Sequence, residues 1–371
     1  MPDFDAIVIG GGLVGTAVAY GLIRRGQKVG VLDEGDIAYR ASRGNFGLVW
    51  VQSKGFGVPE YQRWTRRSSE DWAGFSTELL QETGIATGHE RPGGLTPCLT
   101  ESEFDKRQQL MEQLRSEAGD IPFEFDMLRP AALKKMLPVI GPDVVGASYT
   151  PYDGHANPLY TLRALHAALL KRGGHYVPGS RIENINAAPR QFSVTVRGET
   201  FSAPRVVLGA GLGNKALGAM VGLNVPVRPL RGQIIVTERL QPVLPMPTLM
   251  IRQTVEGTIM IGESREEAGF DDATSPEIIR TLAERAVKTF PFLRNVRIVR
   301  TWGALRVMAP DGLPVYEQSR EFPGAFVCTC HSGVTLAAAH ALHYAGYVID
   351  GALPPELARF STERFNVLAA A

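Results

Sequence analysis

The stretch "DAIVIGGGLVGTAVAYGLIRRGQKVGVLDEGD", residues 5–36, constrains the fold more than any other part of the chain. A short apolar run over residues 5–9 comes before Gly10, Gly12 and Gly15, which are spaced as G-x-G-x-x-G. In that spacing the first glycine allows a tight turn, the second lets the backbone approach a pyrophosphate, and the third lets a helix pack on a strand. The sequence therefore predicts a strand, a turn and a helix whose N-terminus faces a phosphate group.

The residues that follow complete a βαβ unit. Arg24, Arg25 and Gly26 are typical of a helix end, because cations and a C′ glycine are both favoured there. A second strand, "KVGVLD", ends in Asp33, which lies 21 residues after Gly12. A carboxylate in that place binds a ribose hydroxyl, and it disfavours a 2′-phosphate. The unit therefore predicts a dinucleotide site.

The rest of the chain favours FAD over NAD. After the second strand come residues 40–55, "RASRGNFGLVWVQSKG", a loop instead of further βα units. Far downstream, "RVVLGAG" ends on glycines that let a backbone approach a ligand. The stretch "AFVCTCHSGVTLAAAHALHYAGYVI" predicts a strand and then a helix, with Ser332 and Gly333 near the helix start. Three separated strand ends that converge on one cofactor suit the longer FAD molecule.

Length and charge narrow the remaining classes. A chain of 371 residues predicts two domains, and 39 Lys+Arg against 38 Asp+Glu give no sign of a nucleic-acid partner. Residues 6–23 carry no charge, but Asp3 and Asp5 precede them and glycines interrupt them, so we expect neither a signal peptide nor a membrane span. A cytoplasmic location is the default expectation.

The cysteines give no disulfide framework and no zinc spacing. Cys328 and Cys330 form a C-x-C pair, and Cys98 is distant from them in the sequence. The pair either consists of two small side chains buried in a core or has a redox or metal-binding role. We expect no metal site.

The chain resembles the D-amino-acid-oxidase-like FAD oxidoreductases, which include glycine oxidase and sarcosine oxidase. Within that family, the 40–55 loop and "HSGVTLAAAHA" look most like the FAD-bearing β subunits of opine oxidase and D-hydroxyproline dehydrogenase, with hydrogen cyanide synthase more distant. The resemblance runs nearly end to end, and its markers are "GGGLVG", "DGHANP" at 153–158, "VPVRPLRGQIIVTE" at 225–238, "WGALRVMAPDGLP" at 302–314, "HSGVTLA" at 331–337 and "FSTERF" at 360–365.

The resemblance implies a mixed fold: a Rossmann-like α/β FAD-binding domain of the glutathione-reductase type, and a second, substrate-binding domain built on an antiparallel sheet. Residues 1–55, 143–228 and 300–371 are assigned to the FAD-binding domain. Residues 56–142, which read as helical and polar in period, and residues 229–299 are assigned to the substrate-binding domain. In the second part "GQIIVTE" and "GTIMIGES" predict strands, and Ser275 and Pro276 predict a helix start.

Arg306 stands inside an otherwise apolar strand, where an unpaired charge is costly to bury. The resemblance implies that this arginine binds the carboxylate of an amino-acid substrate, for which a planar guanidinium is well shaped. The alternative is a structural ion pair with Asp311. The family has proline after the arginine, whereas Val307 stands here, which leaves the local backbone shape open.

Two further residues have open roles. His331 either assists proton transfer near the flavin or has a structural role at a helix start. Arg252 either provides a second anion contact or is an exposed strand residue. His155 is expected to be structural, and His340 and His343 lack further ligands for a metal. The expected cofactor-binding residues are Gly10, Gly12, Leu13, Val14, Gly15, Asp33, Glu34, Ser42, Arg43, Asn45, Gly47, Leu48, Ile182, Gly209, Gly211, Ser332, Gly333, Val334 and Thr335.

The expected reaction is hydride transfer from the C–H next to an amine to FAD, which gives an imine. No cysteine follows the arginine motif, so we expect non-covalent FAD. Residues 249–262 lack the lysine that, in some relatives, helps oxygen react with the reduced flavin. This favours a dehydrogenase subunit that acts on an opine or D-hydroxyproline and passes its electrons to a partner. Any association with a membrane would then be through that partner. The alternatives are a stand-alone glycine, sarcosine or D-amino-acid oxidase that makes peroxide, and a non-catalytic flavin-binding scaffold.

Overall fold

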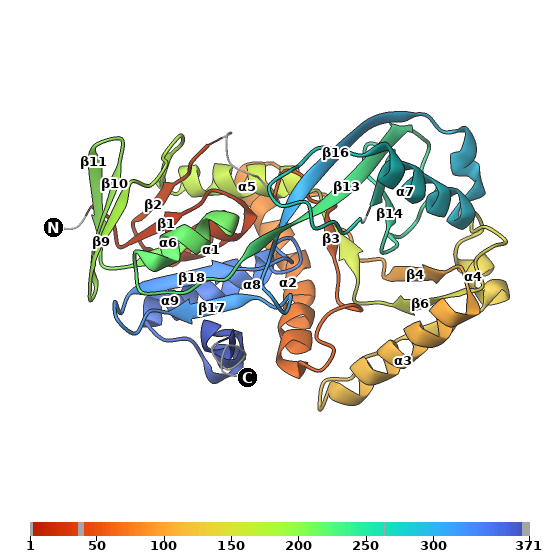
Figure 1. The fold of residues 1–371 in the computed structure, drawn as a ribbon, viewed down its shortest axis with the longest axis horizontal. Helices are drawn as coiled ribbons and strands as arrows, with labels where there is room; N and C mark the ends of the chain where they lie inside the picture. Colours follow the sequence, from red (N-terminus) through yellow and green to blue (C-terminus); the bar gives the residue numbers. More distant parts are fainter. Residues whose placement is uncertain (1–2, 36–40, 263, 366–371) are drawn as a thin grey trace.

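A parallel sheet around β1 (Ala6–Ile9) is the centre of one half of the molecule (Figure 1). The structure is a computed structural model that describes residues 3–35, 41–262 and 264–365. All neighbouring strands of this sheet run parallel except the pair at one edge, β17 and β18. In spatial order its strands are β17 (Val315–Gln318), β18 (Ala325–Thr329), β12 (Val206–Leu208), β1, β2 (Val29–Leu32) and β8 (His175–Val177).

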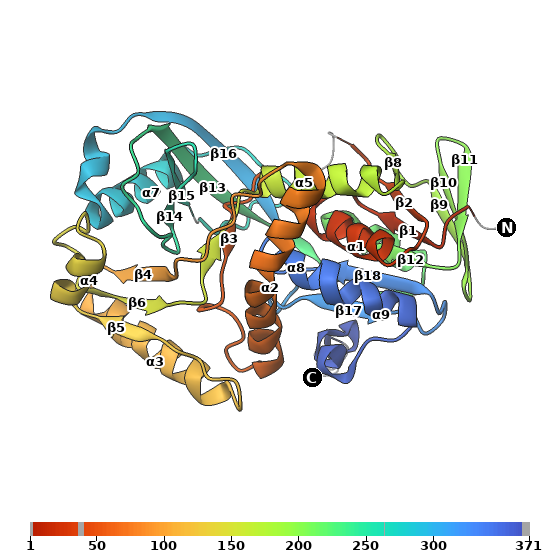
Figure 2. The same ribbon diagram turned by 180° about the vertical axis from the view of Figure 1, so that it is seen from behind.

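Both faces of the parallel sheet are buried, as the unbroken apolar run in β1 predicts. Ala6 and Val8 belong to the core on the helical face, whereas Ile7 and Ile9 belong to the core on the other face. Residues of an antiparallel three-stranded sheet pack in the core on that second face, and Figure 2 shows these strands at the outer end of this half, beside the N-terminus. The covering elements are α1 (Leu13–Arg24), α2 (Pro59–Thr83), α5 (Pro158–Lys171), α8 (Ala337–Ala339) and α9 (Ala345–Asp350) on the helical face, and β9 (Asn184–Ala188), β10 (Gln191–Val196) and β11 (Glu199–Ala203) on the other. We call this half the parallel-sheet body.

The other half, the antiparallel-sheet body, has its own core. Leu95, Ile235, Ile261 and Phe290 are among the buried residues that pack together there. Ser275 caps the helix α7 (Pro276–Thr289) by accepting a hydrogen bond from the N–H of Ile278, and the predicted helix start is therefore confirmed. The elements are a four-stranded sheet of β14 (Ile251–Gln253), β15 (Thr258–Gly262), β13 (Arg228–Arg239) and β16 (Ile298–Met308), a three-stranded sheet of β4 (Gly94–Cys98), β6 (Gly146–Thr150) and β5 (Asp126–Leu128), and the helices α3 (Glu101–Glu117), α4 (Pro130–Met136) and α7 (Pro276–Thr289).

The long antiparallel pair β13–β16 joins the two bodies (Figure 1). At one end Arg228 pairs with Met308, and the neighbouring Val227 and Val307 lie in the core of the parallel-sheet body. At the other end Thr237 pairs with Ile298, beside the core of the antiparallel-sheet body. Side chains in the middle of this pair therefore lie where the two bodies meet.

The predicted fold class, a Rossmann-like α/β unit with a second unit on an antiparallel sheet, is confirmed. The helical prediction for residues 56–142 was wrong in part, because β4 and β5 lie in that stretch. Their strand composition is weak, and they are strands because both pair with β6. Among the described residues, no helix is both long and apolar enough to span a bilayer.

The domain boundaries remain a proposal. Strands β6 and β16 pair with strands of the antiparallel-sheet body, and Trp72 and Phe75 of α2 share a core with Leu13. We therefore propose that the divisions fall close to residues 151 and 309 instead of 143 and 300, with α2 on the cofactor side.

Candidate active site

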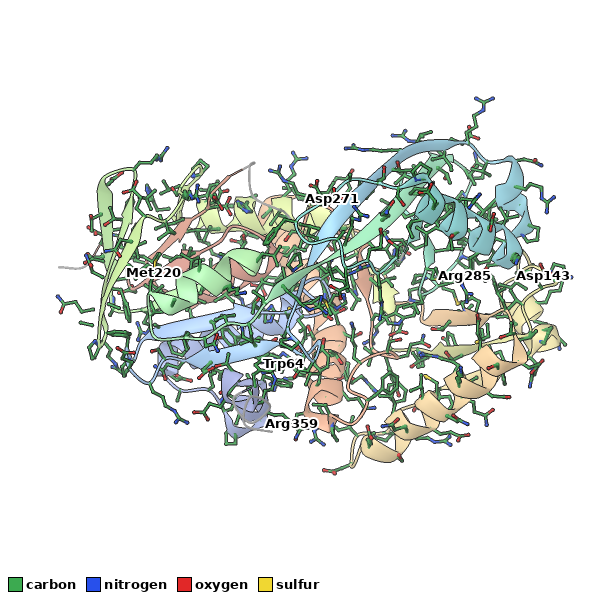
Figure 3. The ribbon with its side chains drawn as sticks, viewed as in Figure 1. Trp64, Asp143, Met220, Asp271, Arg285 and Arg359 are labelled. Atoms are coloured by element: carbon green, nitrogen blue, oxygen red, sulfur yellow. The ribbon has the colours of Figure 1, made fainter. Side chains whose placement is uncertain are left out.

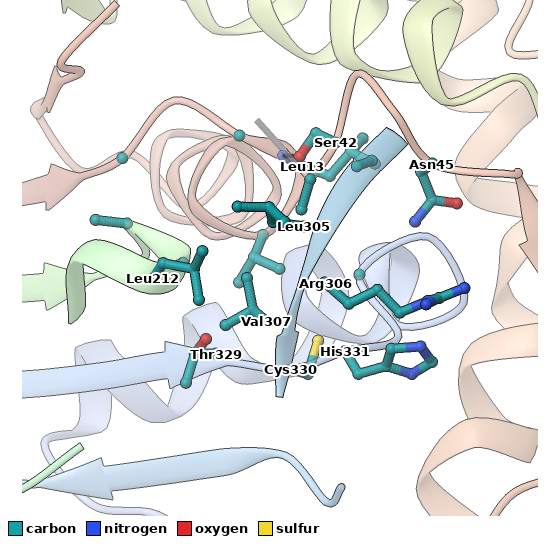
Figure 4. A pocket seen from close by; sticks show the side chains of 18 of the residues that line it. Leu13, Ser42, Asn45, Leu212, Leu305, Arg306, Val307, Thr329, Cys330 and His331 are labelled. Carbon is teal, nitrogen blue, oxygen red and sulfur yellow. Dashed lines mark hydrogen bonds between the residues drawn. The ribbon is translucent and has the colours of Figure 1, made fainter. Parts of the chain in front are cut away.

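A cavity of about 750 Å³ lies where the two bodies meet, next to the β13–β16 pair (Figure 4). The carboxyl ends of β1, β2, β12 and β18 reach it through Gly10, Asp33, Gly209 and Cys330. In open α/β sheets ligands bind at this edge, because the strand ends and helix N-termini converge there. The opposite wall includes Leu305, Arg306 and Val307 of β16, so both bodies contribute.

The glycine-rich turn is shaped by close backbone contacts. Gly10 has φ +111°, and a Cβ there would lie 2.5 Å from the carbonyl oxygen of Gly209. Gly12 is the N-cap of α1, and a Cβ there would lie 3.0 Å from Ser42 Oγ, which accepts a hydrogen bond from the N–H of Leu13 (2.9 Å). The N-terminus of α1 therefore faces the cavity with bare backbone, as a phosphate cradle requires.

Asp33 ends β2 with a carboxylate that is almost fully buried (6% exposed). Its Oδ2 accepts a hydrogen bond from the N–H of Gly11 (2.5 Å) and its Oδ1 from that of Gly35 (2.9 Å). The carboxylate thus fixes the glycine-rich turn while it lines the cavity. A glycine cradle, a helix N-terminus and a buried acid in this order fit the pyrophosphate and ribose of a dinucleotide.

The side chain of Arg306 extends into the same cavity and lies beside His331 (Figure 4). Its Nη1 donates hydrogen bonds to the carbonyl oxygens of Ser264 (2.8 Å) and Arg231 (3.2 Å). A Cβ at Gly232 would lie 2.4 Å from Nη2 of Arg306, so the guanidinium rests against the bare backbone of β13. These contacts hold the charge in one place at the cavity wall.

The neighbours of Arg306 answer two questions that the sequence left open. Asp311 forms its ion pair with Arg364 (2.7 Å). Val307 replaces the proline of the family pattern without interrupting β16, since it pairs in register with Pro229. The strand is therefore regular through the arginine.

His331 is an uncharged imidazole at neutral pH. Burial lowers the pKa of His331 well below its usual value, and the nearby cations Lys54, Arg306 and Arg265 lower it further. Its Nδ1 lies 3.4 Å from Ser332 Oγ, which is 2.9 Å from the hydroxyl of Tyr61. A neutral ring can accept a hydrogen bond at the cavity, but it is a weak base.

The structure does not bring Arg252 to the cavity. Arg252 is 2% exposed, so the alternative of an exposed strand residue was also wrong. Its guanidinium donates to the carbonyl oxygen of Phe46 and lies 3.4 Å from Nδ1 of His155 and 3.1 Å from the sulfur of Met260. It therefore ties the loop after β2 to β7 (Gly154–His155) and β15 from behind the cavity wall.

His155, His340 and the three cysteines are buried, whereas His343 is half-buried and lies 2.7 Å from a carboxylate oxygen of Asp71. Burial lowers the pKa of His155 to about 3 and that of His340 to about 3. Cys328 and Cys330 are buried free thiols in one core, which is the expected packing of a C-x-C strand on one face. The described residues contain no group of side chains that suits a metal ion.

Most of the expected cofactor-binding residues line the cavity, but three do not. Gly15 lies behind the turn, where a Cβ would come within 2.0 Å of the carbonyl oxygen of Gly10, so its role is helix packing. Arg43 and Gly47 are also absent from the lining. Those that line it are Gly10, Gly12, Leu13, Val14, Asp33, Glu34, Ser42, Asn45, Leu48, Ile182, Gly209, Gly211, Ser332, Gly333, Val334 and Thr335.

Sequence reasoning did not single out three lining residues that prove informative. Lys54 lies in the stretch 40–55 that was assigned to the cofactor loop, and Gly232 is a glycine inside a strand, which often marks a close approach. Arg265 follows β15 and carried no recognisable signal. Because Lys54 brings a lysine to the cavity, the lack of lysine in residues 249–262 does not separate a dehydrogenase from an oxidase.

Comparison with known proteins identifies the family. The sequence profile described as "DAO: FAD dependent oxidoreductase" matches residues 5–346. The chain belongs to this family of FAD-dependent oxidoreductases. It is 43% identical over 369 residues to the opine oxidase B subunit of Agrobacterium tumefaciens (strain Ach5) and 42% identical over 366 residues to that of Rhizobium meliloti, with 99% of each chain covered in both cases.

The fold of this FAD-dependent oxidoreductase also matches solved structures. The crystal structure of glycine oxidase from Geobacillus kaustophilus superposes with a TM-score of 0.88, at 24% identity, covering 97% of this chain and 98% of the other. Membership in the family makes FAD the cofactor, and the glycine cradle, α1 and Asp33 fit it. When bound there, FAD supplies a two-electron acceptor for hydride transfer.

Proposed function

We propose that this chain is the catalytic, FAD-binding subunit of a heteromeric dehydrogenase that oxidises a carboxylate-bearing secondary amine of the opine class. The observation that carries the proposal is the guanidinium of Arg306, anchored at the cavity wall beside the neutral His331 (Figure 4). Identity of 42–43% over the full chain to two opine oxidase B subunits supports both the substrate class and the existence of partner subunits.

We propose that each part of the cofactor is bound by a different group of lining residues. Gly10 to Val14 would hold the pyrophosphate, Asp33 the adenosine ribose, and the segment around Ser332 the flavin ring. We propose non-covalent binding. Burial raises the pKa of the Cys330 thiol to about 12, so this lining cysteine stays protonated and is a poor nucleophile.

Two side chains would act on the substrate. Arg306 would form a paired, charge-assisted hydrogen bond with the carboxylate, which orients the C–H next to the amine toward the cofactor. His331, being neutral, would accept a hydrogen bond from the amine N–H. Loss of the hydride from the C–H, with FAD as the two-electron acceptor, would leave a protonated imine. Addition of water would then release a carbonyl compound and a protonated primary amine.

An anaerobic flavin-bleaching assay tests the proposal. The purified chain would be mixed with opines, D-hydroxyproline, D-proline, sarcosine, glycine and D-amino acids, and each reactive compound would be repeated in air with peroxide detection. We expect bleaching by secondary-amine acids and little peroxide. Arg306→Met should lower kcat/KM by roughly a hundredfold, since a charged hydrogen-bonded pair stabilises by about 1.5–3 kcal/mol and more when bidentate.

The controls separate this proposal from its alternatives. Arg239→Met removes an exposed arginine at the end of β13 and should leave the reaction unchanged. Rapid peroxide formation would favour a stand-alone oxidase. A full complex that turns over normally with Arg306→Met would show that the chain is a flavin-binding scaffold and would overturn the proposal.

We also propose a cytoplasmic location, with any membrane association provided by partner subunits. Cys98, Cys328 and Cys330 are free thiols, which suits a reducing compartment.

A further inference from the structure

The guanidinium of Arg306 is held by two backbone carbonyl groups from different segments. Its Nη1 donates to the carbonyl oxygen of Arg231 in β13 and to that of Ser264, which follows β15. The guanidinium reaches both by lying against Gly232, the residue after Arg231. The position of Arg306 therefore depends in part on what fixes the carbonyl groups of Arg231 and Ser264.

The carboxylate of Glu266 binds the side chains of both Ser264 and Arg231. The hydroxyl of Ser264 donates to Oε1 (2.7 Å), and the guanidinium of Arg231 donates to Oε2 through Nε (3.1 Å) and Nη2 (2.8 Å). The backbone is paired as well, since the N–H of Glu266 donates to the carbonyl oxygen of Arg231 (3.0 Å) and the N–H of Arg231 to that of Glu266 (2.9 Å). The carbonyl oxygen of Arg231 thus accepts from both Glu266 and Arg306.

Gln233 adds a third partner to this carboxylate. Its Nε2 donates to Oε2 of Glu266 (2.9 Å), its backbone N–H donates to Ser264 Oγ (2.7 Å), and its side chain is fully buried. Burial alone would raise the pKa of Glu266, but the hydrogen bonds that the carboxylate accepts hold this pKa below its usual value. Glu266 is therefore a mostly buried, charged group that joins β13 to the segment after β15.

The two faces of β13 have separate tasks at this point. A Cβ at Gly232 would point at the guanidinium of Arg306, so the side chains of Arg231 and Gln233, one residue to either side, lie on the opposite face. Arg231 also pairs with Asp271 (2.5 Å), which lies near the β13–β16 pair (Figure 3). The segment 264–271 is therefore fixed to β13 near both of its ends.

We propose that Glu266 is a positioning residue for the carboxylate site: it fixes the carbonyl groups of Ser264 and Arg231, and these hold the guanidinium of Arg306. This inference rests on the proposed function and adds a residue that sets the affinity for the substrate carboxylate. Glu266 is not among the described residues that line the cavity, so it acts through Arg306. Without Glu266 the guanidinium would be less well ordered, and a paired hydrogen bond, which needs a fixed geometry, would form less often.

Binding of an unreactive carboxylate measures this effect without turnover. Pentanoate and pentanamide have nearly the same shape, but only pentanoate carries a negative charge for Arg306. Each would be titrated into the FAD-loaded chain, and Kd would be read from the flavin absorbance. We expect Glu266→Ala to raise the Kd of pentanoate roughly tenfold, the value of one charge-assisted hydrogen bond, and to leave that of pentanamide nearly unchanged.

Two further variants keep the test informative. Glu267→Ala is the matched control, because it removes an exposed carboxylate from the same segment that pairs with Arg228 of the same strand (2.5 Å), and it should change neither Kd. Ser264→Ala removes only a hydroxyl partner of Glu266 and should raise the Kd of pentanoate about threefold. If Glu266→Ala does not bind FAD, Ser264→Ala decides: a rise limited to pentanoate supports the inference, and no rise overturns it.

A double variant separates positioning from a general structural effect. In an Arg306→Met background, Glu266→Ala should cause no further rise in the Kd of pentanoate, because its effect passes through the guanidinium. An equal rise with and without Arg306, or an unchanged Kd in Glu266→Ala alone, would overturn the inference and leave the proposed function intact. Equal affinity of the unsubstituted chain for pentanoate and pentanamide would overturn the carboxylate site of the proposed function as well.

Discussion

Gly232→Ala tests whether the observed position of Arg306 is the one that binds substrate. A Cβ at this position would lie 2.4 Å from Nη2 and 2.5 Å from both Cζ and Nη1 of Arg306. Ordinary contacts begin at about 3.4 Å, so the guanidinium must move by about 1 Å. A displacement of that size at a positioned catalytic group lowers the rate by roughly a hundredfold. We therefore expect kcat/KM for a carboxylate-bearing amine to fall by about that factor.

The fold should tolerate this substitution. Gly232 is not among the glycines with positive φ, so alanine suits the strand, and the clash is with the end of a flexible side chain. Thermal unfolding and FAD content should therefore stay unchanged. Gly74→Ala on α2 is the matched control, because a Cβ there meets nothing within 4 Å and should leave the kinetics unchanged.

A double variant distinguishes displacement of Arg306 from simple obstruction of the cavity. In an Arg306→Met background, Gly232→Ala should have little further effect on kcat/KM, because the group that it displaces is already gone. A full additional loss in that background would indicate obstruction. Unchanged kcat/KM for Gly232→Ala alone would refute the assignment of the carboxylate site to this guanidinium position.

Three further outcomes follow from the described contacts. Arg107→Met should lower the free energy of unfolding in urea by about 3 kcal/mol, because it leaves the buried polar atoms of Gln52 without their charged partner. Burial lowers the pKa of His340 to about 3, so between pH 7.5 and 5.5 only the unfolded chain takes up a proton at this residue, and the free energy of unfolding falls by about 1.4 kcal/mol. His340→Gln should abolish this part of the pH dependence, which urea unfolding at the two pH values would measure. Asp33→Ala should weaken FAD binding at least tenfold in a fluorescence titration of the apoprotein, because the ribose partner is lost and the turn at Gly11 is released.

The cofactor half of the site was predictable because its signals are local. Gly10, Gly12 and Asp33 are close in sequence, and each has a fixed task in a strand–turn–helix unit. The second half depends on pairing between distant segments. Lys54 reaches the cavity because the nearby Gln52 forms hydrogen bonds with Arg107 and Asp153. Gln52 and Asp153 are separated by about a hundred residues of sequence, so no local sequence pattern predicts the network.

Arg252 is the converse case, because the sequence singled it out as a possible site residue and the structure places it outside the cavity lining. Its sequence context, a polar residue on a short strand, suits either an anion contact or an exposed position, and both interpretations were wrong. The deciding contacts are with Phe46, His155 and Met260, which come from three other parts of the chain. A buried arginine is placed by what surrounds it, and sequence distance hides those partners.

Arg306 and Arg252 together indicate how this molecule uses arginine. Both lie near the junction of the two bodies, and both donate to backbone carbonyl oxygens. Arg252 is fully enclosed by protein groups behind the wall, whereas Arg306 is partly exposed and lines the cavity beside His331. The difference lies in β13, where Gly232 leaves room for the guanidinium of Arg306 to lie along the cavity wall. The glycine in "PLRGQ" is therefore as much a part of the carboxylate site as the arginine that it accommodates.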